Sequence, residues 1–425
     1  MNQQFYGWKL TMVLWGLCVF VLGFTSYGGP VMNTFMMTEL HLDRKSLALA
    51  GGAFSVCMGL VSPLAGYVVS RWGARATLSA GILLASLGSL ALATVVNSVA
   101  GVMVAYGAIV GSATALGGQV PCNAVLSYWF KKRLALVLAI VSTGTSVGGF
   151  LASPLLTKVI MAAGGNWRAG WFVVAATCAL AFIVSILFVR NKPSDLGQVQ
   201  DGIADVGVDA DAPDAKPASC VYKTAEDWIF RDAVRNPVFW IMILSVGVST
   251  SVWGILVGHG MAFFNDLGHS PQQGAVFLSC LVSSGLGGKA LFAALGDRIE
   301  PRFLWSASLF AIAAAMLMVA NTTSAVELYA CAIVLGAMAP VGMLSMFTLT
   351  ANYYGKTAYA SLTGVTGLFI ALLPSSVGFV AGVVFDHFGS YSLAFNTHAG
   401  FGVLAGLMIP FAITARQPVE SLEAA

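Results

Sequence analysis

One lysine forms a lone positive charge in the middle of a long apolar segment. Lys289 lies within Ser270–Leu295, and the next charged residue, Asp297, is about 12 Å further along if the segment is a helix. An ammonium group in hydrocarbon costs about 3 kcal/mol or more, so such residues usually face a bundle interior or an aqueous cavity. A fixed cation in that setting predicts a ligand that is negatively charged or rich in carbonyl oxygens.

The composition predicts a membrane protein. Of 425 residues, 58% are hydrophobic and 9% are charged, whereas roughly 25% are charged in an ordinary soluble domain. Apolar stretches of about 20 residues recur along almost the whole chain, and each is long enough to cross a hydrocarbon core of roughly 30 Å. The first begins near Trp8 and is too long for the apolar core of a signal peptide, so it is predicted to be a transmembrane helix.

Several function classes are excluded by what the chain contains. The net charge of +3 is small and the basic residues are scattered, which argues against nucleic acid as a partner. Six of the seven cysteines fall in apolar spans and Cys220 lies in the central loop, so neither a disulfide framework nor a metal site is expected. The sequence has no Ser/His/Asp constellation, metal-spaced histidines or phosphate-binding loop. We therefore expect no enzyme activity, no cofactor and no metal.

Gly, Pro and charged residues divide the apolar stretches into twelve predicted transmembrane helices. Six lie near residues 8–30, 46–69, 76–96, 99–129, 134–162 and 167–189. Six more lie near residues 237–265, 272–296, 303–320, 325–353, 358–385 and 391–415. The acidic, Pro- and Ala-rich stretch between the two sets, residues 190–236, is predicted to be a linker. The predicted fold is an all-α membrane protein of two six-helix bundles, residues 1–190 and 237–425, joined by residues 191–236.

The distribution of basic residues predicts the orientation in the membrane. Of the 21 Lys and Arg residues, sixteen fall on the side of the termini, four on the other side, and Lys289 within a span. Positive charge concentrates in cytoplasmic loops, so the termini and the linker are expected to be cytoplasmic. The chain is then a multi-pass protein of the cell membrane (the inner membrane where there are two), and a monomer is expected.

The two halves carry a short repeat. Residues 70–75 (SRWGAR) follow the second span and residues 297–302 (DRIEPR) follow the eighth, and each has two arginines four apart at an offset of 227 residues. Two six-helix halves related by an axis along the membrane normal describe a secondary transporter whose site lies between the halves near the midplane. The same offset pairs Lys289 with Ser62, so one half offers a cation where the other offers a hydroxyl.

Short segments along the chain carry a family resemblance. They are residues 6–8 (YGW), 66–75 (GYVVSRWGAR), 128–133 (YWFKKR), 190–197 (RNKPSDLG), 236–240 (NPVFW), 353–355 (YYG) and 382–391 (GVVFDHFGSY). In order and spacing they resemble the major facilitator superfamily, and more narrowly its group of monocarboxylate transporters and oxalate/formate antiporters. The resemblance covers nearly all of the chain except the linker and the C-terminal tail, and it implies the major facilitator fold. Ser70 departs from it, because an Asp is usual there.

The resemblance implies a role for Lys289. In that group the helix 8 position eight residues before the loop Asp is usually an arginine that binds the substrate carboxylate. A guanidinium binds a carboxylate with two parallel hydrogen bonds whereas an ammonium is a point charge, so a different set of carboxylates is expected here. Burial favours the neutral form of a lysine, which makes Lys289 a candidate for proton coupling as well as for substrate binding. The alternative is a lysine that reaches the cytoplasm or is paired within the bundle.

The proton partner found in some group members is missing. They place a carboxylate one turn before the arginine, where this chain has Gly285, and none of the eighteen Asp and Glu residues lies deep in a span. His259, in the outer half of helix 7, is the remaining titratable candidate, either to carry a proton or to bind substrate. The alternative is a histidine satisfied by a neighbouring helix. His398 in helix 12 is predicted to serve packing.

Other residues are predicted to line the substrate site because their spans are expected to face the cavity. They are Tyr27, Gln119, Asn123, Phe347 and Phe369. Gln119 and Asn123 are four apart and share a helix face. Pro121 between them interrupts the helical hydrogen bonds and could free backbone groups toward a cavity. Aromatic residues in such spans often face lipid or the core instead, which is the alternative for Phe347 and Phe369.

Arg71, Asp297 and Arg298 lie at predicted cytoplasmic helix ends and are candidate gating residues. As a gate they would form interhelical ion pairs that latch the cytoplasmic side in the outward-open state. As simple anchors the arginines would reach lipid headgroups. The second half keeps its carboxylate whereas the first half has Ser70, so Asp297 and Arg298 are the better gate candidates.

These features predict a secondary active transporter of a small organic anion, a monocarboxylate, driven by proton symport or by exchange for another anion. Its expected partners are that anion, a proton or counter-anion, and the lipid bilayer. One alternative is an exporter of neutral or drug-like solutes, which would have an acidic or uncharged cavity. Another is a transporter-like sensor that binds its ligand without moving it.

Overall fold

The computed structural model describes residues 5–39, 44–202, 221–224 and 226–413. These residues form helices joined by turns and loops, with no strand among them. Twelve of the described helices are long and apolar enough to cross a membrane. Their bounds lie within a few residues of the predicted spans, and two spans, 99–129 and 134–162, coincide with the prediction. Cys220 and linker residues 203–220 lie outside the described residues.

Six spans form the N-terminal half. The first contains α1 (Tyr6–Leu17), η1 (Cys18–Gly23) and α2 (Phe24–Glu39). The second and third are α3 (Arg44–Trp72) and α4 (Ala74–Thr94). The fourth contains α5 (Val99–Val102), η2 (Met103–Val110), α6 (Gly111–Leu116) and α7 (Gln119–Trp129). The fifth and sixth are α8 (Leu134–Ala162) and α9 (Trp167–Phe188).

The described part of the linker and six further spans complete the chain. The linker contains η3 (Pro193–Leu196), η4 (Gln200–Gly202) and α10 (Phe230–Arg235). The seventh to ninth spans are α11 (Pro237–Asp266), α12 (Pro271–Leu295) and α13 (Pro301–Asn321). The tenth to twelfth are α14 (Ala325–Tyr354), α15 (Tyr359–Phe388) and α16 (Ser392–Met408) with η5 (Ile409–Phe411).

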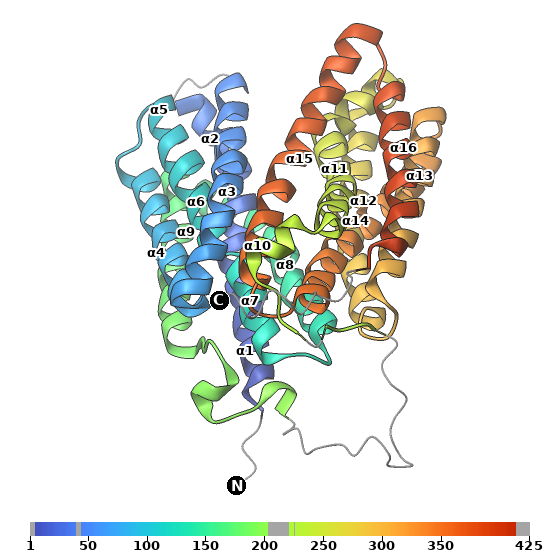
Figure 1. Ribbon diagram of the computed structural model, residues 1–425. Coiled ribbons are helices and arrows are strands. Elements are labelled where there is room, and N and C mark those ends of the chain that lie inside the picture. Colours follow the sequence, from blue (N-terminus) through green and yellow to red (C-terminus); the bar gives the residue numbers. More distant parts are fainter. Residues whose placement is uncertain (1–4, 40–43, 203–220, 225, 414–425) are drawn as a thin grey trace.

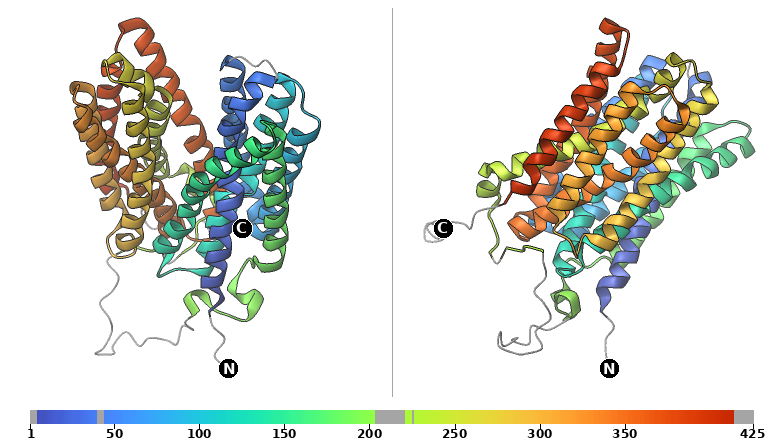
Figure 2. Two further views of the ribbon diagram at one scale, coloured as in Figure 1. Left: turned by 180° about the vertical axis from the view of Figure 1, so that it is seen from behind. Right: turned by 90° about the vertical axis from the view of Figure 1, so that its right-hand side faces the viewer.

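The helices form two groups that meet at one end and diverge toward the other, as both views from front and back show (Figures 1 and 2). We call the end where α1 begins and the linker lies the linker side, and the opposite end the far side. Between the groups, α3 packs on α15 and α12 packs on α8. The second helix of each half therefore meets the fifth helix of the other, which is the pairing expected from two repeats related by an axis along the membrane normal.

The repeated arginines make equivalent bonds in the two halves. The guanidinium of Arg75 donates to the carbonyl of Ile186 near the end of α9. The guanidinium of Arg302 donates to the carbonyl of Pro410 in η5 at 3.0 Å. Each arginine thus ties the start of the third span of its half to the end of the sixth.

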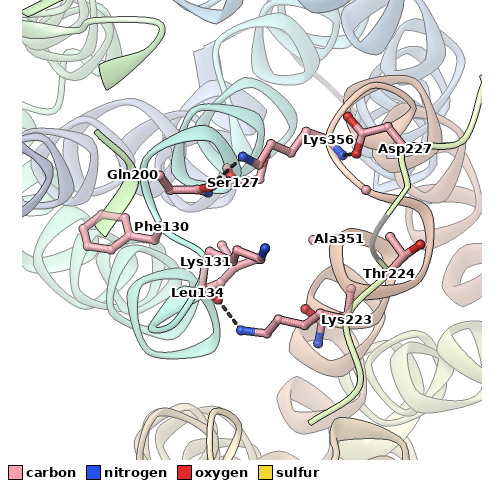
Figure 3. A pocket seen from close by; sticks show the side chains of 12 residues that line it. Ser127, Phe130, Lys131, Leu134, Gln200, Lys223, Thr224, Asp227, Ala351 and Lys356 are labelled. Carbon is pink, nitrogen blue, oxygen red and sulfur yellow. Dashed lines mark hydrogen bonds between the residues drawn. The ribbon is translucent and has the colours of Figure 1, made fainter. Parts of the chain in front are cut away.

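Carboxylates close the linker side around a cavity of about 250 Å³ (Figure 3). Asp201 accepts backbone N–H bonds from Lys131 and Lys132 in the loop before α8. Asp227 accepts the N–H of Lys356 at 2.9 Å in the loop before α15. The two loops occupy equivalent places in the two halves, because each joins the fourth span of its half to the fifth.

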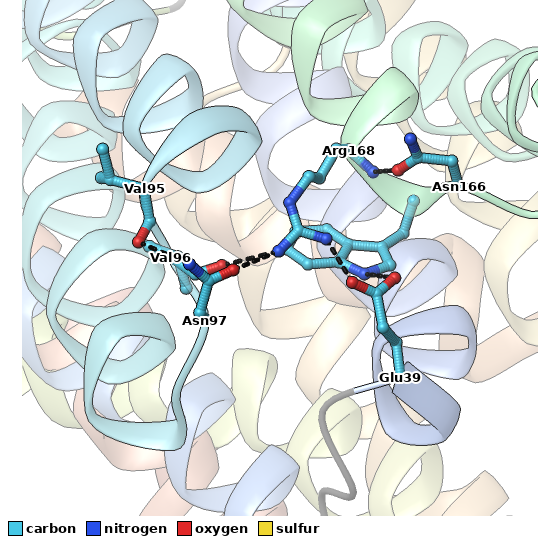
Figure 4. Close-up of polar contacts among 7 residues, drawn as sticks. Glu39, Val95, Val96, Asn97, Asn166 and Arg168 are labelled. Carbon is cyan, nitrogen blue, oxygen red and sulfur yellow. Dashed lines mark hydrogen bonds and ion pairs between the residues drawn. The ribbon is translucent and has the colours of Figure 1, made fainter.

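An ion pair holds the far side of the N-terminal half (Figure 4). Arg168, at the start of α9, pairs with Glu39 at the end of α2 and donates to Asn97 after α4. The indole N–H of Trp167 donates to the same carboxylate at 2.8 Å. These bonds join the far ends of three spans within one half.

Candidate functional site

Lys289 lies between the two halves, where α12 meets α8, and its side chain is 8% exposed. Its Nζ donates to the carbonyl of Ser142 at 2.8 Å and to the Oγ of Ser146 at 2.7 Å. Both acceptors belong to the other half. The lysine therefore bridges the halves and does not extend to the membrane surface.

Among the described residues, no carboxylate forms an ion pair with Lys289. The ion pair between Arg168 and Glu39 is the one salt bridge in the described part of the chain, and it lies on the far side. An ammonium has three N–H donors and two are used here, so one remains for a ligand. Because a neutral acceptor brings no opposite charge, an anion would stabilise this cation further.

Ser62 lies at the matching interface in the other half. It is buried in α3, and a Cβ added to Gly367 of α15 would lie 2.9 Å from its side chain. Its hydroxyl donates to the carbonyl of Met58 within the same helix at 2.8 Å. The position that the sequence offset pairs with Lys289 is therefore also between the halves, but its hydroxyl is already used locally.

The fourth span is interrupted where the sequence places its amide residues. α6 ends at Leu116 and α7 begins at Gln119, and Gly118 between them has a non-helical backbone, with φ −117° and ψ −136°. Pro121 lies in the first turn of α7, where its missing N–H costs no helical bond. The interruption thus lies at Gly117 and Gly118 rather than at the proline. It creates a helix N-terminus within the span, and such a terminus favours negative charge.

Gln119 and Asn123 lie together at this terminus. The Nε2 of Gln119 donates to the Oδ1 of Asn123 at 3.2 Å. Asn123 is fully buried, and its Nδ2 has no hydrogen-bond partner among the described residues. An unused buried donor is costly, so this amide is suited to an acceptor that the protein itself does not supply.

Cys18 packs on the same helix as the partners of Lys289. A Cβ added to Gly144 of α8, which lies between Ser142 and Ser146, would be 3.0 Å from the Cβ of Cys18. Cys18 is the first residue of the π-helical segment η1, and π segments in helices are frequent at functional sites. No hydrogen bond joins Lys289 to Gln119 or Asn123 within the described residues, so the lysine and the amides form two separate groups.

Tyr27 packs on the same helix as the partners of Lys289. A Cβ added to Gly149 of α8 would lie 2.7 Å from the Tyr27 ring. Gly149 is three residues after Ser146, so both lie on nearly the same face of α8. Tyr27 is 44% exposed and its hydroxyl makes no hydrogen bond among the described residues.

The two predicted phenylalanines have different surroundings. Phe347 of α14 is buried in a core cluster that contains residues of both halves, among them Phe292, three residues after Lys289. It therefore packs where the halves meet. Phe369 is half-buried, with its ring 5.8 Å from that of Trp240 in a T-shaped contact between α15 and α11. This ring contact is one of packing within the C-terminal half.

His259 is satisfied by its neighbours. Its Nε2 is 2.9 Å from the carbonyl of Gly378 in α15, and its Nδ1 is 3.3 Å from the hydroxyl of Tyr391. With a carbonyl on one nitrogen and a hydroxyl on the other, a neutral ring can satisfy both partners. The Nε2 of His398 is 3.1 Å from the carbonyl of Val248, and its buried Nδ1 has no hydrogen-bond partner among the described residues.

The gating candidates divide into one that bridges the halves and two that do not. Asp297 accepts the backbone N–H of Ala135 and of Leu136, each at 3.0 Å, so it caps α8 from the opposite half. Arg71 and Arg298 are exposed, and their side chains form no ion pair or hydrogen bond within the described residues. The contact across the halves is therefore a helix cap rather than an ion pair.

The sequence alone does not single out Ser142 and Ser146 as the partners of Lys289, or Cys18 as a residue packed beside them. The two serines are four apart on one span and so share a face, which is a signal that could have found them. Nothing in the sequence points to Cys18, because small polar residues are common throughout these helices.

Comparison with known proteins adds to this picture. A family model described as Major Facilitator Superfamily matches residues 15–378. The hexuronate transporter of Escherichia coli (strain K12) is 23% identical over an alignment that covers 97% of this chain and 96% of that protein. Human monocarboxylate transporter 10 is 24% identical, over 87% of this chain and 70% of that protein.

A solved structure shows the same fold. The crystal structure of the Escherichia coli fucose:proton symporter, FucP (N162A), is similar with a TM-score of 0.71, over 97% of this chain and all of that one. The two sequences are 12% identical. The similarity is therefore one of architecture.

Proposed function

The chain belongs to the Major Facilitator Superfamily, and from that premise we propose that it is a secondary active transporter of a small organic anion. The proposed substrate is a monocarboxylate. Lys289 is the observation that carries the proposal, because its buried ammonium has no carboxylate partner among the described residues and one N–H to spare. A substrate carboxylate would supply the missing negative charge between the halves.

The amides of the N-terminal half favour a substrate with hydroxyl groups. Gln119 and the unpartnered Nδ2 of Asn123 offer donors and acceptors that complement hydroxyls. A hexuronate transporter and a monocarboxylate transporter are 23% and 24% identical to this chain. The names of both relatives denote carboxylates. A hydroxylated monocarboxylate fits both the site and the names of these relatives.

The charge of the site favours anion exchange over net transport. A bound monoanion neutralises Lys289, so the loaded site would change orientation without moving an unbalanced charge through a low dielectric. An empty site would have to carry the bare ammonium. Proton symport would instead require Lys289 to release its proton in the empty state. His259 is the weaker candidate for a proton carrier because both ring nitrogens are occupied.

The arrangement of the halves supports transport by alternating access. They meet on the linker side and diverge on the far side (Figure 1), and Asp297 caps α8 across the closed end. We propose that the linker side and both termini are cytoplasmic, so that this is the outward-facing state, with Asp297 as a gate residue. We also propose that the transporter works as a monomer in the cell membrane.

The test is uptake of labelled hexuronate and of a simple monocarboxylate into proteoliposomes. Lys289→Gln should reduce uptake at least about tenfold, because the loss of roughly 1.4 kcal/mol of anion binding gives that factor. Lys158→Gln is the matched control, since Lys158 is an exposed lysine on α8. Normal uptake by Lys289→Gln would exclude the proposal.

The same preparation separates the alternatives. Exchange predicts faster uptake into anion-loaded vesicles than into empty ones, whereas symport predicts stimulation by an inward proton gradient. Saturable binding without flux would indicate a sensor. Transport of neutral or cationic solutes that Lys289→Gln leaves unchanged would indicate an exporter of neutral or drug-like solutes.

A further inference from the structure

The cavity on the linker side lies between equivalent loops of the two halves (Figure 3). Lys131, in the loop between α7 and α8, and Lys356, in the loop between α14 and α15, line it from opposite halves. Lys223 of the linker lines it as well. Its volume of about 250 Å³ is below the roughly 300–1,000 Å³ of pockets for drug-sized ligands, so only a small ligand fits.

The three lysines converge on the cavity without ion pairs. Lys223 donates through Nζ to the carbonyl of Lys131, and Lys356 donates through Nζ to the Oε1 of Gln200 at 2.6 Å. The Lys131 ammonium points into the open space (Figure 3) and has no hydrogen-bond partner among the described residues. Each lysine therefore retains N–H donors that face neutral acceptors or none.

Nearby carboxylates are already used by backbone N–H groups and a hydroxyl. Asp227, which lines the cavity, accepts the N–H of Lys356 at 2.9 Å and the hydroxyl of Thr357 at 2.8 Å. Asp201 and Asp297 accept backbone N–H groups at the start of α8. None of them forms a salt bridge with a lysine in the described part of the chain.

Two further observations indicate a missing partner. Asn352 lines the cavity, and its buried Nδ2 has no hydrogen-bond partner among the described residues. Burial lowers the pKa of Lys223 and of Lys356, although the charges of Asp297 near Lys223 and of Asp227 near Lys356 act in the opposite direction. A negatively charged group among them would give the Asn352 amide an acceptor and the lysines an opposite charge.

We propose that this cavity binds a small oxyanion of the phosphate class between Lys131, Lys223 and Lys356. The bound anion contacts both halves and the linker, so it stabilises the state that is closed on the linker side. The site is separate from Lys289 and does not depend on the proposed substrate. It rests on the proposed function in one respect only: because the linker side is proposed to be cytoplasmic, the anion would come from the cytoplasm.

The test measures binding of inorganic phosphate to the purified full-length protein in neutral detergent by calorimetry, with chloride at equal ionic strength as the reference. Lys131→Gln, Lys223→Gln and Lys356→Gln should each weaken binding about three- to tenfold, as expected for the loss of one partly exposed charge contact. Lys132→Gln is the matched control, because Lys132 is the exposed neighbour of Lys131 and does not line the cavity. Thermal unfolding without phosphate shows whether each variant is folded.

Hydrogen exchange gives a second readout that does not depend on the variants. Phosphate should protect the amides of residues 131–136 and 353–358, one loop from each half. Lys289→Gln should keep this protection and the phosphate affinity even where it abolishes anion uptake. Loss of phosphate binding in Lys289→Gln would place the phosphate in the central site and overturn the proposal.

The source of the phosphate group can be distinguished in nanodiscs. If a lipid headgroup fills the cavity, phosphatidylglycerol should weaken the apparent affinity for inorganic phosphate relative to phosphatidylcholine alone, and Lys223→Gln should abolish that difference. If free phosphate is the ligand, the two lipids should give equal affinities. Absence of saturable phosphate binding in both detergent and phosphatidylcholine would exclude the site.

Discussion

At the scale of single residues, Lys289 shows how an isolated cation is tolerated between helices. It uses two neutral acceptors, Ser142 and Ser146, and both lie on the opposite half. In the proposed cycle a substrate carboxylate accepts the spare N–H and, because it is charged where the serine acceptors are neutral, draws the ammonium away from them. The lysine would then be held by α8 in the empty protein and by substrate in the loaded one.

Removing one acceptor should therefore change substrate affinity. In Ser146→Ala the ammonium loses a hydrogen bond in the empty state, and a net bond of this kind is worth about 1 kcal/mol. We expect the carboxylate to bind about fivefold more tightly, as measured by calorimetry on the purified protein. Ser153→Ala, at an exposed position of α8, is the control and should bind normally. Weaker binding by Ser146→Ala would instead indicate that this hydroxyl contacts the substrate.

At the scale of elements, the interruption of the fourth span determines where the amides point. The chain passes from α6 to α7 through Gly117 and Gly118. These glycines pack closely on other helices, since a Cβ added to Gly118 would lie 2.3 Å from the carbonyl oxygen of Thr114 and 2.8 Å from Leu22. A backbone oxygen cannot move aside as a flexible side chain can. A side chain at this position must therefore displace the start of α7.

Gly118→Ala should thus destabilise the protein by about 1–3 kcal/mol, as steric overpacking does. Thermal unfolding should show a lowered Tm, and carboxylate binding should weaken because Gln119 and Asn123 move with α7. Gly52→Ala is the control, because that exposed helical position has open space around it. A Tm equal to that of the control would contradict the role assigned to the break.

At the scale of the whole molecule, different hydrogen bonds close the two halves on the linker side. The second half uses Asp297, which caps α8 across the interface. The first half has Ser70 in the matching loop, and this hydroxyl bonds only the carbonyl of Tyr67 in its own helix. Asp227 of the linker instead holds the loop before α15. The linker therefore takes part in closing the molecule.

The buried carboxylates of this side predict a pH dependence of stability. Burial raises the pKa of Asp297 and also that of Glu300, despite the hydrogen bonds that each accepts. A raised pKa means that the folded state binds the proton more tightly than the unfolded state does. Their contribution to stability is therefore greatest below the ordinary carboxyl pKa near 4 and declines as pH rises through the raised values.

Thermal unfolding of the wild type and of Asp297→Asn between about pH 4 and pH 7 tests this prediction. The wild type should lose more stability over that range than the variant, because the amide does not titrate. Asp386→Asn, at an exposed position on the far side, should follow the wild-type profile. Parallel profiles for Asp297→Asn and the wild type would contradict the prediction.

The sequence by itself determined the class, the spans and the lone cation. Hydropathy and charge are properties of each segment, and a segment in lipid must satisfy its own backbone hydrogen bonds as a helix, so the twelve spans follow from local composition. The arginine repeat was also visible, and Arg75 and Arg302 occupy equivalent places in the structure. Lys289 stood out because no other charge lies within its span.

Only the tertiary structure decided which groups meet. Lys289 bonds residues up to 147 positions away in the chain, and His259 bonds Gly378 at a separation of 119. The interruption of the fourth span at Gly118 likewise follows from contacts with the first span as well as with its own helix. These contacts depend on how whole helices pack, and many helix faces offer similar small polar residues. Local sequence patterns therefore cannot predict which helix faces meet. The packing of the two halves determines it.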